Sequence, residues 1–471
     1  MTENSSPKAA SATQEEVVTL YKKHKKIHPR SVKGRFATWR WIFVWLTQII
    51  FYGLPWLPWG DRPAVLFDLV HRKFYLFGLV LWPQDVFFLA ILLIISAYAL
   101  FLFTAVAGRL WCGYACPQTV YTEIFMWIEK LIEGERPARV KLDAAPMDAR
   151  KFRLRATKYA LWVLFAWWTG FTFVGYFTPI RELWPAFWSW NLGPWETFWI
   201  FFYGAFTYVF AGHLREQVCL YMCPYARFQS VMFDPDTLVI TYDTERGEPR
   251  GARRKGVDPR SIGKGDCIDC GICVQVCPTG IDIRNGLQYE CIGCAACIDG
   301  CDEVMDKMGY PRGLIRYTTE HAMELHWGRK EILRHVFRPR IIVYTVILLA
   351  FVSGLAWGLW HKADLRVDVI RDRGVLAREV EGMIENVYSL QVMNVSEKPR
   401  RYALSVSGIE GIELAGSQEI EVPAASTRTF SYPVRVPPDA AKKGSHTIYF
   451  DVRSLDDEQV KVREKTTFLM P

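Results

Sequence analysis

Five long apolar runs divide an otherwise polar chain. They cover residues 41–59, 86–107, 159–178, 198–212 and 341–360. A membrane-spanning helix needs about 20 mostly apolar residues, and none of the five runs contains an internal Lys or Arg. The fourth run is short and has Glu196 at its outer end, although Trp195 extends it backwards. We expect five transmembrane helices, with a shorter apolar run at residues 74–82 lying at the membrane interface.

Basic residues are unevenly distributed among the segments between these runs. Residues 1–36, 108–157 and 213–340 hold 8, 9 and 18 Lys and Arg, whereas residues 60–84 and 180–194 hold 3 and 1. Cytoplasmic loops carry the excess of Lys and Arg, so the N-terminus and both long loops are predicted to be cytoplasmic. Five spans then place the C-terminus on the other side. Because a long polar and basic stretch precedes the first run, we expect that run to be an uncleaved anchor.

The last part of the chain has a different pattern. Between residues 362 and 471, short runs rich in β-branched and aromatic residues alternate with turn signals, at 388–395, 401–406, 418–422, 428–436, 447–452 and 459–468. Six or seven short strands in a segment of this length predict an immunoglobulin-like β-sandwich. The segment has no Cys and no cluster of ionisable residues, which favours a docking role over catalysis.

The overall composition averages these unlike parts. Of the 471 residues, 51% are hydrophobic and 23% are charged, and the net charge is +8. Residues 362–471 hold 16 basic and 17 acidic residues, so the basic excess lies before them, where membrane topology explains it. Nucleic-acid binding is therefore not expected; residues 250–260 are the one local candidate and are interpreted as a flexible linker. The apolar content excludes intrinsic disorder, and 12 Cys are too dilute for a small disulfide scaffold.

The 12 Cys fall into four groups, two of which share one spacing. Both follow the C-x2-C-x2-C-x3-C pattern of bacterial ferredoxins with two 4Fe–4S clusters, in which the fourth Cys of each run binds the other cluster. The expected ligands are Cys267, Cys270, Cys273 and Cys301 for the first cluster, and Cys277, Cys291, Cys294 and Cys297 for the second. The alternative is a pair of zinc sites or unused thiols, which two complete copies of the spacing disfavour.

Residues beside these motifs refine the prediction. Small residues, namely Gly271, Gly293 and Ala295, would let backbone N–H groups approach the cluster sulfurs and tune the potential. Asp302 follows the second motif where Pro is usual. That departure changes the loop without removing a ligand.

The other two groups are Cys112/Cys116 and Cys219/Cys223, each in a C-x3-C-P motif that follows an apolar run. Pro suits the first position of a helix, so Cys116 and Cys223 are expected to cap helices that begin at Pro117 and Pro224. The helix dipole and nearby Arg109 or Arg215 would lower the thiol pKa there.

The repeat of span, span and motif would bring the four thiols together at the inner face of the membrane. Soft thiolates select Cu(I), zinc or iron–sulfur groups, and a pair of thiols can also form a disulfide. The alternative is that each Cys is only a small apolar residue at a helix end.

Other ligand sets are not apparent in the sequence. None of the nine His lies inside an apolar run, so haem bound between two His is not expected, and no intramembrane charges indicate ion transport. His213 lies near the second C-x3-C pair and is expected to be solvated at the interface. His321 and His326 are expected to face solvent or the membrane surface.

These patterns predict a multi-domain membrane protein with an α-helical five-span bundle, an inserted ferredoxin-like domain with two 4Fe–4S clusters, and a C-terminal immunoglobulin-like β-sandwich. The predicted parts are a basic cytoplasmic N-terminal segment (1–36, its first 20 residues disordered), a four-span bundle with both C-x3-C-P motifs (37–233), the cytoplasmic two-cluster domain (234–339), a fifth transmembrane helix (340–361) and the exported sandwich (362–471).

The arrangement resembles a known family. The string GRLWCGYACPQTV at residues 108–120, the second C-x3-C-P motif, the tandem cluster motifs, the fifth apolar run and the sandwich are all similar to cytochrome c oxidase accessory proteins of the CcoG/FixG/RdxA family. The resemblance implies a bacterial inner-membrane protein whose C-terminal domain is periplasmic. It also implies a cupric reductase that serves assembly of the cbb3-type oxidase, with Cys112, Cys116, Cys219 and Cys223 handling copper or electrons.

The implied partners are a cytoplasmic electron donor and a copper chaperone, copper transporter or the oxidase assembly machinery. Two other functions remain open. One is a quinol dehydrogenase or electron-transfer subunit of a respiratory chain, against which the fifth span and the exported sandwich argue. The other is a non-catalytic assembly scaffold whose clusters only brace the fold.

Overall fold

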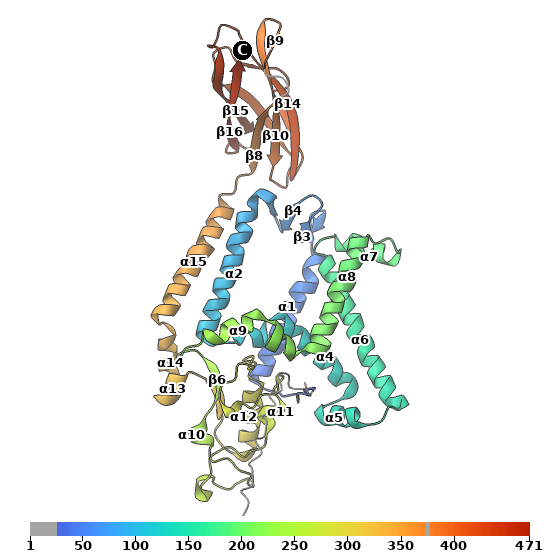
Figure 1. Ribbon diagram of the computed structural model, residues 1–471, viewed down its shortest axis with the longest axis vertical. Coiled ribbons are helices and arrows are strands. Elements are labelled where there is room, and N and C mark those ends of the chain that lie inside the picture. Colours follow the sequence, from blue (N-terminus) through green and yellow to red (C-terminus); the bar gives the residue numbers. More distant parts are fainter. Residues whose placement is uncertain (1–25, 373–376) are drawn as a thin grey trace, which may run out of the picture.

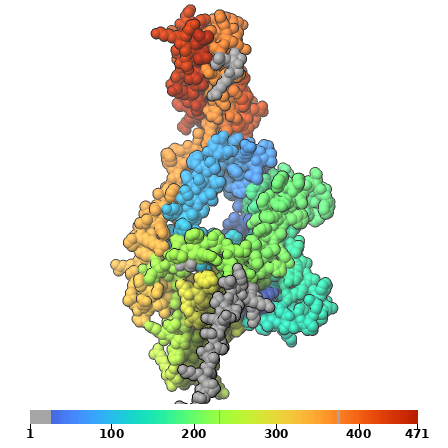
Figure 2. Space-filling model, viewed as in Figure 1, coloured from blue at the N-terminus to red at the C-terminus, as the bar shows by residue number. Residues whose placement is uncertain are grey.

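The structure is a computed structural model that describes residues 26–372 and 377–471. The predicted disorder of residues 1–20 therefore lies outside the described residues. The C-terminal β domain stands at one end of the elongated molecule, the cysteine-rich unit at the other, and helices connect them (Figures 1 and 2).

Two long apolar helices join the two ends of the molecule. Helix α2 (Val86–Ala107) and helix α15 (Pro339–Trp360) lie side by side and run in opposite directions (Figure 1). The rings of Tyr98 and Phe351 lie 6.0 Å apart between them. Among the described residues, these two helices alone, the first counted from Pro83, are long and apolar enough to cross a membrane.

The other three expected spans do not meet that criterion. Helices α1 (Arg35–Gly53) and α6 (Ala149–Val174) begin with basic residues and are rich in Trp and Tyr, which favour the membrane interface over its centre. Helix α8 (Pro194–Thr207) is short and continues as the π-helix η3 (Tyr208–Leu214). The five-span bundle therefore stays a prediction.

Helices α6 and α8 nevertheless pack tightly against each other. A Cβ at Gly170 would lie 2.1 Å from the carbonyl oxygen of Ile200, so only Gly allows this approach. The rings of Phe173 and Tyr203 stack 4.1 Å apart. The remaining elements of this part are α3 (Leu110–Tyr114), α4 (Pro117–Glu133), α5 (Arg136–Ala144), α7 (Ile180–Trp188), the π-helix η4 (Val218–Met222) and α9 (Pro224–Val231).

The cysteine-rich unit is built of short elements around a two-stranded antiparallel sheet. Strand β6 (Val239–Tyr242) pairs with β7 (Ile315–Thr318), and their buried side chains pack against the loops that carry the cysteines. The helices are α10 (Thr244–Gly247), α11 (Ile272–Gln275) and α12 (Ala296–Met308), with 3-10 turns at Arg260–Ile262 and Ile283–Asn285. Helices α13 (Glu320–Glu324) and α14 (Arg329–Val336) lead into α15.

The C-terminal domain is a sandwich of two antiparallel sheets, as predicted. One sheet has the order β12-β14-β10-β8 with β9 paired to β10, and the other has the order β13-β11-β15-β16. Alternate residues of both sheets fill the core, among them Tyr388, Tyr402 and Phe450. The strands are β8 (Leu365–Arg371), β9 (Arg378–Val380), β10 (Met383–Asn394), β11 (Arg400–Ser407), β12 (Glu413–Leu414), β13 (Glu419–Val422), β14 (Ser426–Val436), β15 (Gly444–Ser454) and β16 (Lys461–Met470).

The segment between α1 and α2 is folded into β structure. A 3-10 turn at Leu54–Trp56 and the paired strands β1 (Pro58–Trp59) and β2 (Arg62–Pro63) precede a three-stranded sheet of β3 (Val65–Asp68), β4 (Lys73–Leu76) and β5 (Leu79–Leu81). The run 74–82, expected at the membrane interface, thus forms two of these strands. Val80 and Trp82 pack against Met393 and Val395 of the sandwich, and this contact fixes one end of the C-terminal domain.

Candidate functional site: two cluster sites and a cysteine turn

The eight ferredoxin-type cysteines line two neighbouring cavities. The first cavity is lined by Cys267, Cys270, Cys273 and Cys301, and Tyr242 and Arg284 are among its other lining residues. Cys277, Cys291, Cys294 and Cys297 line the second, and Cys273 reaches it as well. The two cavities group the cysteines as the expected crossed sets do, except that Cys273 lines both, and the assignment of ligands to clusters stays a prediction. These are called site 1 and site 2 below.

The residues present fit two 4Fe–4S clusters. Such a cluster takes one thiolate at each of four irons, and each cavity is lined by at least four cysteines. Gly271, Gly293 and Ala295 have φ values of 64°, 68° and 58°, the left-handed geometry that turns backbone N–H groups inwards. Burial raises the pKa of the Cys301 thiol to about 12, so binding iron there would release a proton.

Asp302 has a structural role at the position where Pro is usual. Helix α12 continues through Cys301 and Asp302, whereas Pro inside a helix would remove a backbone hydrogen bond. The Asp302 carboxylate accepts a hydrogen bond from the backbone N–H of Gly313 at 2.9 Å. The departure thus joins α12 to the strand β7 that follows.

The two C-x3-C-P motifs form matching turns. Cys116 is the N-cap of α4 and Cys223 is the N-cap of α9, with Pro117 and Pro224 as the first helical residues, as predicted. The Cys112 thiol donates to Oε1 of Gln229 at 3.6 Å, and Thr119 donates its hydroxyl proton to the Cys112 carbonyl at 2.6 Å. Gln229 lies on α9, so the first motif is held by the helix that follows the second.

The four thiols of these turns share one half-buried environment. Ionised Cys116, Cys219 and Cys223 would each raise the pKa of Cys112, because like charges this close repel. We refer to the four cysteines together as the cysteine turn. Among residues 26–372 and 377–471, no three His, Cys, Asp or Glu side chains converge on a single point that could hold one metal ion.

The expected lowering of the thiol pKa is wrong for Cys116, because burial raises the pKa of this thiol although the backbone N–H groups of Thr119 and Gln118 favour the thiolate. Burial raises the pKa of Cys112 and of Cys219 to about 12, and it outweighs the opposing charge of Arg109. Arg109 is buried and donates to the carbonyl of Ala226 at 2.5 Å. Arg215, the other cation expected to act on the thiols, instead pairs with Glu129 at 2.8 Å.

The cysteine turn lies directly against site 2. A Cβ on Gly113 would be 2.9 Å from both the Cα and the backbone nitrogen of Cys294. Cys112 packs in one apolar cluster with Val276, Ile292 and Cys294. Cys219, Pro278 and Ile292 line one small cavity together. The cysteine turn therefore lies nearer to site 2 than to site 1, and site 1 lies on the far side of site 2.

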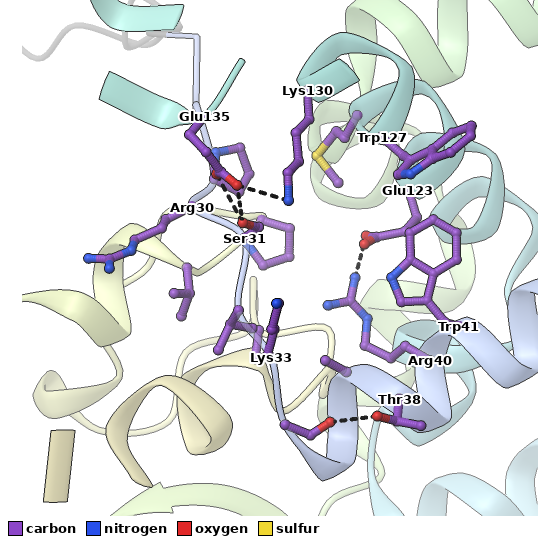
Figure 3. A pocket seen from close by; sticks show the side chains of 18 of the residues that line it. Arg30, Ser31, Lys33, Thr38, Arg40, Trp41, Glu123, Trp127, Lys130 and Glu135 are labelled. Carbon is purple, nitrogen blue, oxygen red and sulfur yellow. Dashed lines mark hydrogen bonds and ion pairs between the residues drawn. The ribbon is translucent and has the colours of Figure 1, made fainter. Parts of the chain in front are cut away.

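A larger cavity of about 760 Å³ opens beside site 2. Figure 3 shows the Lys33 ammonium and the Arg40 guanidinium pointing into the same space, with Trp41 and Trp127 on one side. Arg40 pairs with Glu123, and Lys130 lies 2.9 Å from Glu135. Val276, Pro278 and Ala296, the neighbours of site 2 ligands, complete the wall.

A buried charge network that the sequence did not predict anchors the helices around the cysteine turn. Glu129 of α4 is inaccessible and pairs with Arg215 at 2.8 Å and with Lys26 at 2.9 Å. Lys158 of α6 is also inaccessible and lies 2.9 Å from Glu133. The sequence signal that could have indicated this network is the pair Glu129 and Glu133, which lie four residues apart on α4 beside apolar positions. The network fixes α4, whose first residue follows Cys116.

Asp299 is a second link that the sequence did not reveal. It lies on α12 between two cluster ligands, and its carboxylate accepts from the backbone N–H groups of Phe36 at 3.2 Å and Ala37 at 2.7 Å. These groups belong to the first turn of α1, where unsatisfied donors need an acceptor. The cysteine-rich unit thus caps the first apolar helix.

The histidines singled out in the sequence lie away from the cysteines. His213 is exposed and stacks on Tyr159, with ring centroids 6.1 Å apart. His321 lies 2.8 Å from Asp236, and His326 is exposed near Glu245. They make protein contacts that need no metal.

Comparison with protein-family models gives three matches. A model described as "4Fe-4S dicluster domain" matches residues 214–320, and one described as "4Fe-4S binding domain" matches residues 89–134. The model for the immunoglobulin-like fold at the C-terminus of FixG matches residues 355–471. The first two matches take in both C-x3-C-P motifs as well as the tandem cluster motifs.

Comparison with solved structures gives matches that cover about a fifth of this chain. The FixG-related protein from Vibrio parahaemolyticus is 27% identical, with 22% of this chain and 95% of that chain covered and a TM-score of 0.21. A fragment of alpha-2-macroglobulin from Escherichia coli is 15% identical over 22% of this chain and 16% of that chain, with a TM-score of 0.17.

Curated relatives match most of the chain. Nitrogen fixation protein FixG of Rhizobium meliloti is 40% identical over 423 residues, which cover 83% of this chain and 80% of the relative. Proteins RdxB and RdxA of Cereibacter sphaeroides are each 40% identical, over 87% of this chain and 89% and 88% of their own lengths. With its 4Fe–4S domains and its FixG-type C-terminal fold, this chain belongs to the FixG, RdxA and RdxB family of iron–sulfur electron-transfer proteins.

Proposed function

We propose that this protein is a membrane-bound cupric reductase that supplies Cu(I) for assembly of a cbb3-type cytochrome c oxidase. The observation that carries the proposal is the contact between the cysteine turn and site 2, where Gly113 meets the backbone of Cys294. Soft ligands for copper and ligands for an electron-transfer group lie on two sides of one backbone contact.

Bound 4Fe–4S clusters would supply reversible one-electron transfer at sites 1 and 2. The chain's own contribution is to fix the separation between these sites and the cysteine turn. Gln229 orients Cys112 through its thiol, and its Nε2 donates to the Gly108 carbonyl at 2.9 Å. Ile292 and Val276 exclude water from the contact between Cys112 and site 2.

The cysteine turn suits the reduced form of its substrate. Cu(II) gains one electron and becomes Cu(I), which thiolates bind in preference to harder ligands. Because burial holds the pKa of Cys112 and Cys219 near 12, these thiols are protonated until copper arrives, and copper binding releases their protons.

The proposal includes the membrane arrangement. We infer five spans in the bacterial inner membrane, with the N-terminus and sites 1 and 2 in the cytoplasm and residues 362–471 in the periplasm. The distribution of 35 Lys and Arg on one side and 4 on the other supports it. The sandwich would then dock the oxidase assembly machinery or a copper chaperone.

A Cu(II)-reduction assay on the purified, cluster-loaded protein tests the function. Replacing Cys112, Cys116, Cys219 and Cys223 by Ser should reduce the rate at least about 100-fold, while EPR signals of both reduced clusters persist. Met222→Leu is the matched control, because it removes an exposed sulfur beside Cys223 and should leave the rate unchanged. An unchanged rate in the fourfold Ser variant would refute the copper site.

The cavity beside site 2 favours quinol oxidation as a second candidate function. Trp41 and Trp127 would form the wall for a planar ring, and Glu123 and Glu135 would accept protons. Cluster reduction by a quinol that is lost in Trp127→Ala but kept in the fourfold Ser variant would favour this function over copper reduction.

A further inference from the structure

Residues 250–264 form a strongly charged loop beside site 1, and they include the segment 250–260 that the sequence alone presents as a flexible linker. The loop holds six basic residues and one acidic residue, Asp258. We call it the basic loop. It lies in the cysteine-rich unit, at the opposite end of the molecule from the C-terminal domain (Figure 1).

The basic loop is attached to a site 1 ligand by its backbone. Gly251 donates its N–H to the Cys267 carbonyl at 3.1 Å, and Arg253 donates to the same carbonyl at 3.4 Å. The Arg253 guanidinium also donates to the Tyr310 hydroxyl at 2.9 Å and lies over that ring. The Tyr310 hydroxyl in turn donates to the Val257 carbonyl at 2.8 Å. These contacts hold the loop in place, so it is not a free linker.

Other cations of the basic loop face solvent. Arg254, Lys255 and Arg260 are exposed, and within residues 26–372 and 377–471 no carboxylate pairs with their side chains. Arg250 differs, because it lies 3.8 Å from Glu248. The exposed cations thus leave a net positive surface that has no counterpart within the described chain.

Site 1 is also the more accessible of the two cluster sites. Its ligand Cys270 is exposed, whereas the ligands of site 2 are buried or half-buried. Because site 2 contacts the cysteine turn, an electron that crosses both sites towards copper must enter at site 1. The basic loop lies at that entrance.

We propose that the basic loop is the docking surface for an acidic, water-soluble protein that carries single electrons. Opposite charges on two partners steer their encounter and accelerate association. Cys267, Cys270, Cys273 and Cys301 would hold a cluster that could accept the one electron the carrier gives up, and no bond or proton would be transferred. The direction of transfer rests on the proposed function. A nucleic acid is the other anionic partner, but it gives no reason for the loop to adjoin an exposed cluster ligand.

Charge reversal in the full-length, cluster-loaded protein tests the proposal. The variant Arg254→Glu/Lys255→Glu leaves Arg253 and its contacts intact, and Lys442→Glu/Lys443→Glu in the C-terminal domain is the matched control with two exposed Lys. Reduced plant-type ferredoxin, which is acidic, serves as the carrier, and reduced methyl viologen serves as a small cationic donor. Stopped-flow absorbance follows cluster reduction, and binding of oxidised ferredoxin is measured separately.

At low ionic strength, the loop variant should be reduced by ferredoxin at least about tenfold more slowly than the parent, and its affinity for ferredoxin should fall by a similar factor. Raised salt should slow the parent towards the variant. The C-terminal variant should match the parent, and viologen should reduce all three proteins without being slowed by the reversal.

Equal ferredoxin rates and affinities in the loop variant and the parent would overturn the proposal. Binding of an RNA or DNA oligonucleotide that is lost in the loop variant, with no change in ferredoxin binding, would overturn it in favour of nucleic acid. Neither the reduction rate nor the binding of ferredoxin depends on copper. A negative result in the Cu(II)-reduction assay would therefore leave both readouts unchanged, so the two proposals can fail independently.

Discussion

Gly113 lies so close to Cys294 that a Cβ at residue 113 would be 2.9 Å from the Cys294 Cα and backbone nitrogen. Gly113 follows Cys112 of the cysteine turn, and Cys294 is a ligand of site 2. On the other side of the contact, a Cβ at Gly293 would be 3.0 Å from the Arg109 carbonyl. The two loops therefore touch along their backbones, with no side chain between them.

Replacing Gly113 by Ala should separate the cysteine turn from site 2. A contact under 3.0 Å with backbone atoms cannot be relieved by rotating a side chain, so one loop must move. We expect both clusters to remain visible by EPR, while Cu(II) reduction slows several-fold. Gly354→Ala in α15 is the control, because a Cβ there meets no neighbour within 4 Å. A Gly113→Ala protein with the parent rate would show that the contact is dispensable.

Two Cys→Ser variants should alter the same EPR signal when both cysteines belong to one crossed set of cluster ligands. Cys301→Ser and Cys267→Ser should alter the same EPR signal although they lie in different motifs, because both line site 1. Cys277→Ser and Cys291→Ser should alter the other signal. If Cys301→Ser instead matched Cys291→Ser, each motif would hold its own cluster and the crossed assignment would be wrong.

Replacing Asp299 by Ala should loosen the attachment of α1 to the cysteine-rich unit. The variant leaves the N–H groups of Phe36 and Ala37 without their acceptor, and loss of an N-terminal cap costs about 0.5–2 kcal/mol. Thermal unfolding in detergent should shift downwards by a few degrees. Asp306→Ala, on the exposed side of the same helix, should shift it less. Equal shifts would argue against a capping role.

Replacing Glu129 by Gln should destabilise the helices around the cysteine turn. The change leaves Arg215, Lys26 and Arg139 without their shared carboxylate, and breaking a buried ion pair costs about 3–5 kcal/mol. Glu135→Gln is the matched control, because the Glu135 side chain is half exposed. Similar unfolding temperatures for the two variants would contradict the prediction.

The same carboxylate should make stability depend on pH in one direction. Burial alone would raise the pKa of Glu129, but Arg215 and Lys26 lower it below its ordinary value. A depressed carboxylate pKa stabilises the fold fully above the unfolded value of about 4.3, and the stabilisation is lost as pH falls below it. The free energy of unfolding should therefore fall more steeply between pH 6 and 3 in the parent than in Glu129→Gln. Parallel curves of unfolding free energy against pH would exclude this linkage.

The sequence by itself determined the parts of the molecule whose signals are local. The spacing predicted two crossed sets of four cluster ligands, because the fourth Cys of each run lies too far along the chain to bind the same cluster as the first three. Pro117 and Pro224 identified the N-caps at Cys116 and Cys223, since Pro favours the first position of a helix. Alternation of apolar residues predicted the C-terminal sandwich. The prediction missed strand β8, and the short strands β9 and β12 gave too little pattern to be found.

Only the tertiary structure decided what depends on residues that are far apart in the chain. Burial raises the pKa of the Cys116 thiol, which the helix dipole and a nearby Arg were expected to lower, because desolvation depends on the whole surroundings of a group. Asp299 caps a helix that lies more than 260 residues before it in the chain. Glu129 forms ion pairs with cations from three separate segments. The contact of Gly113 with Cys294 has no sequence signal, since a glycine reveals nothing about its neighbour until the backbones are brought together.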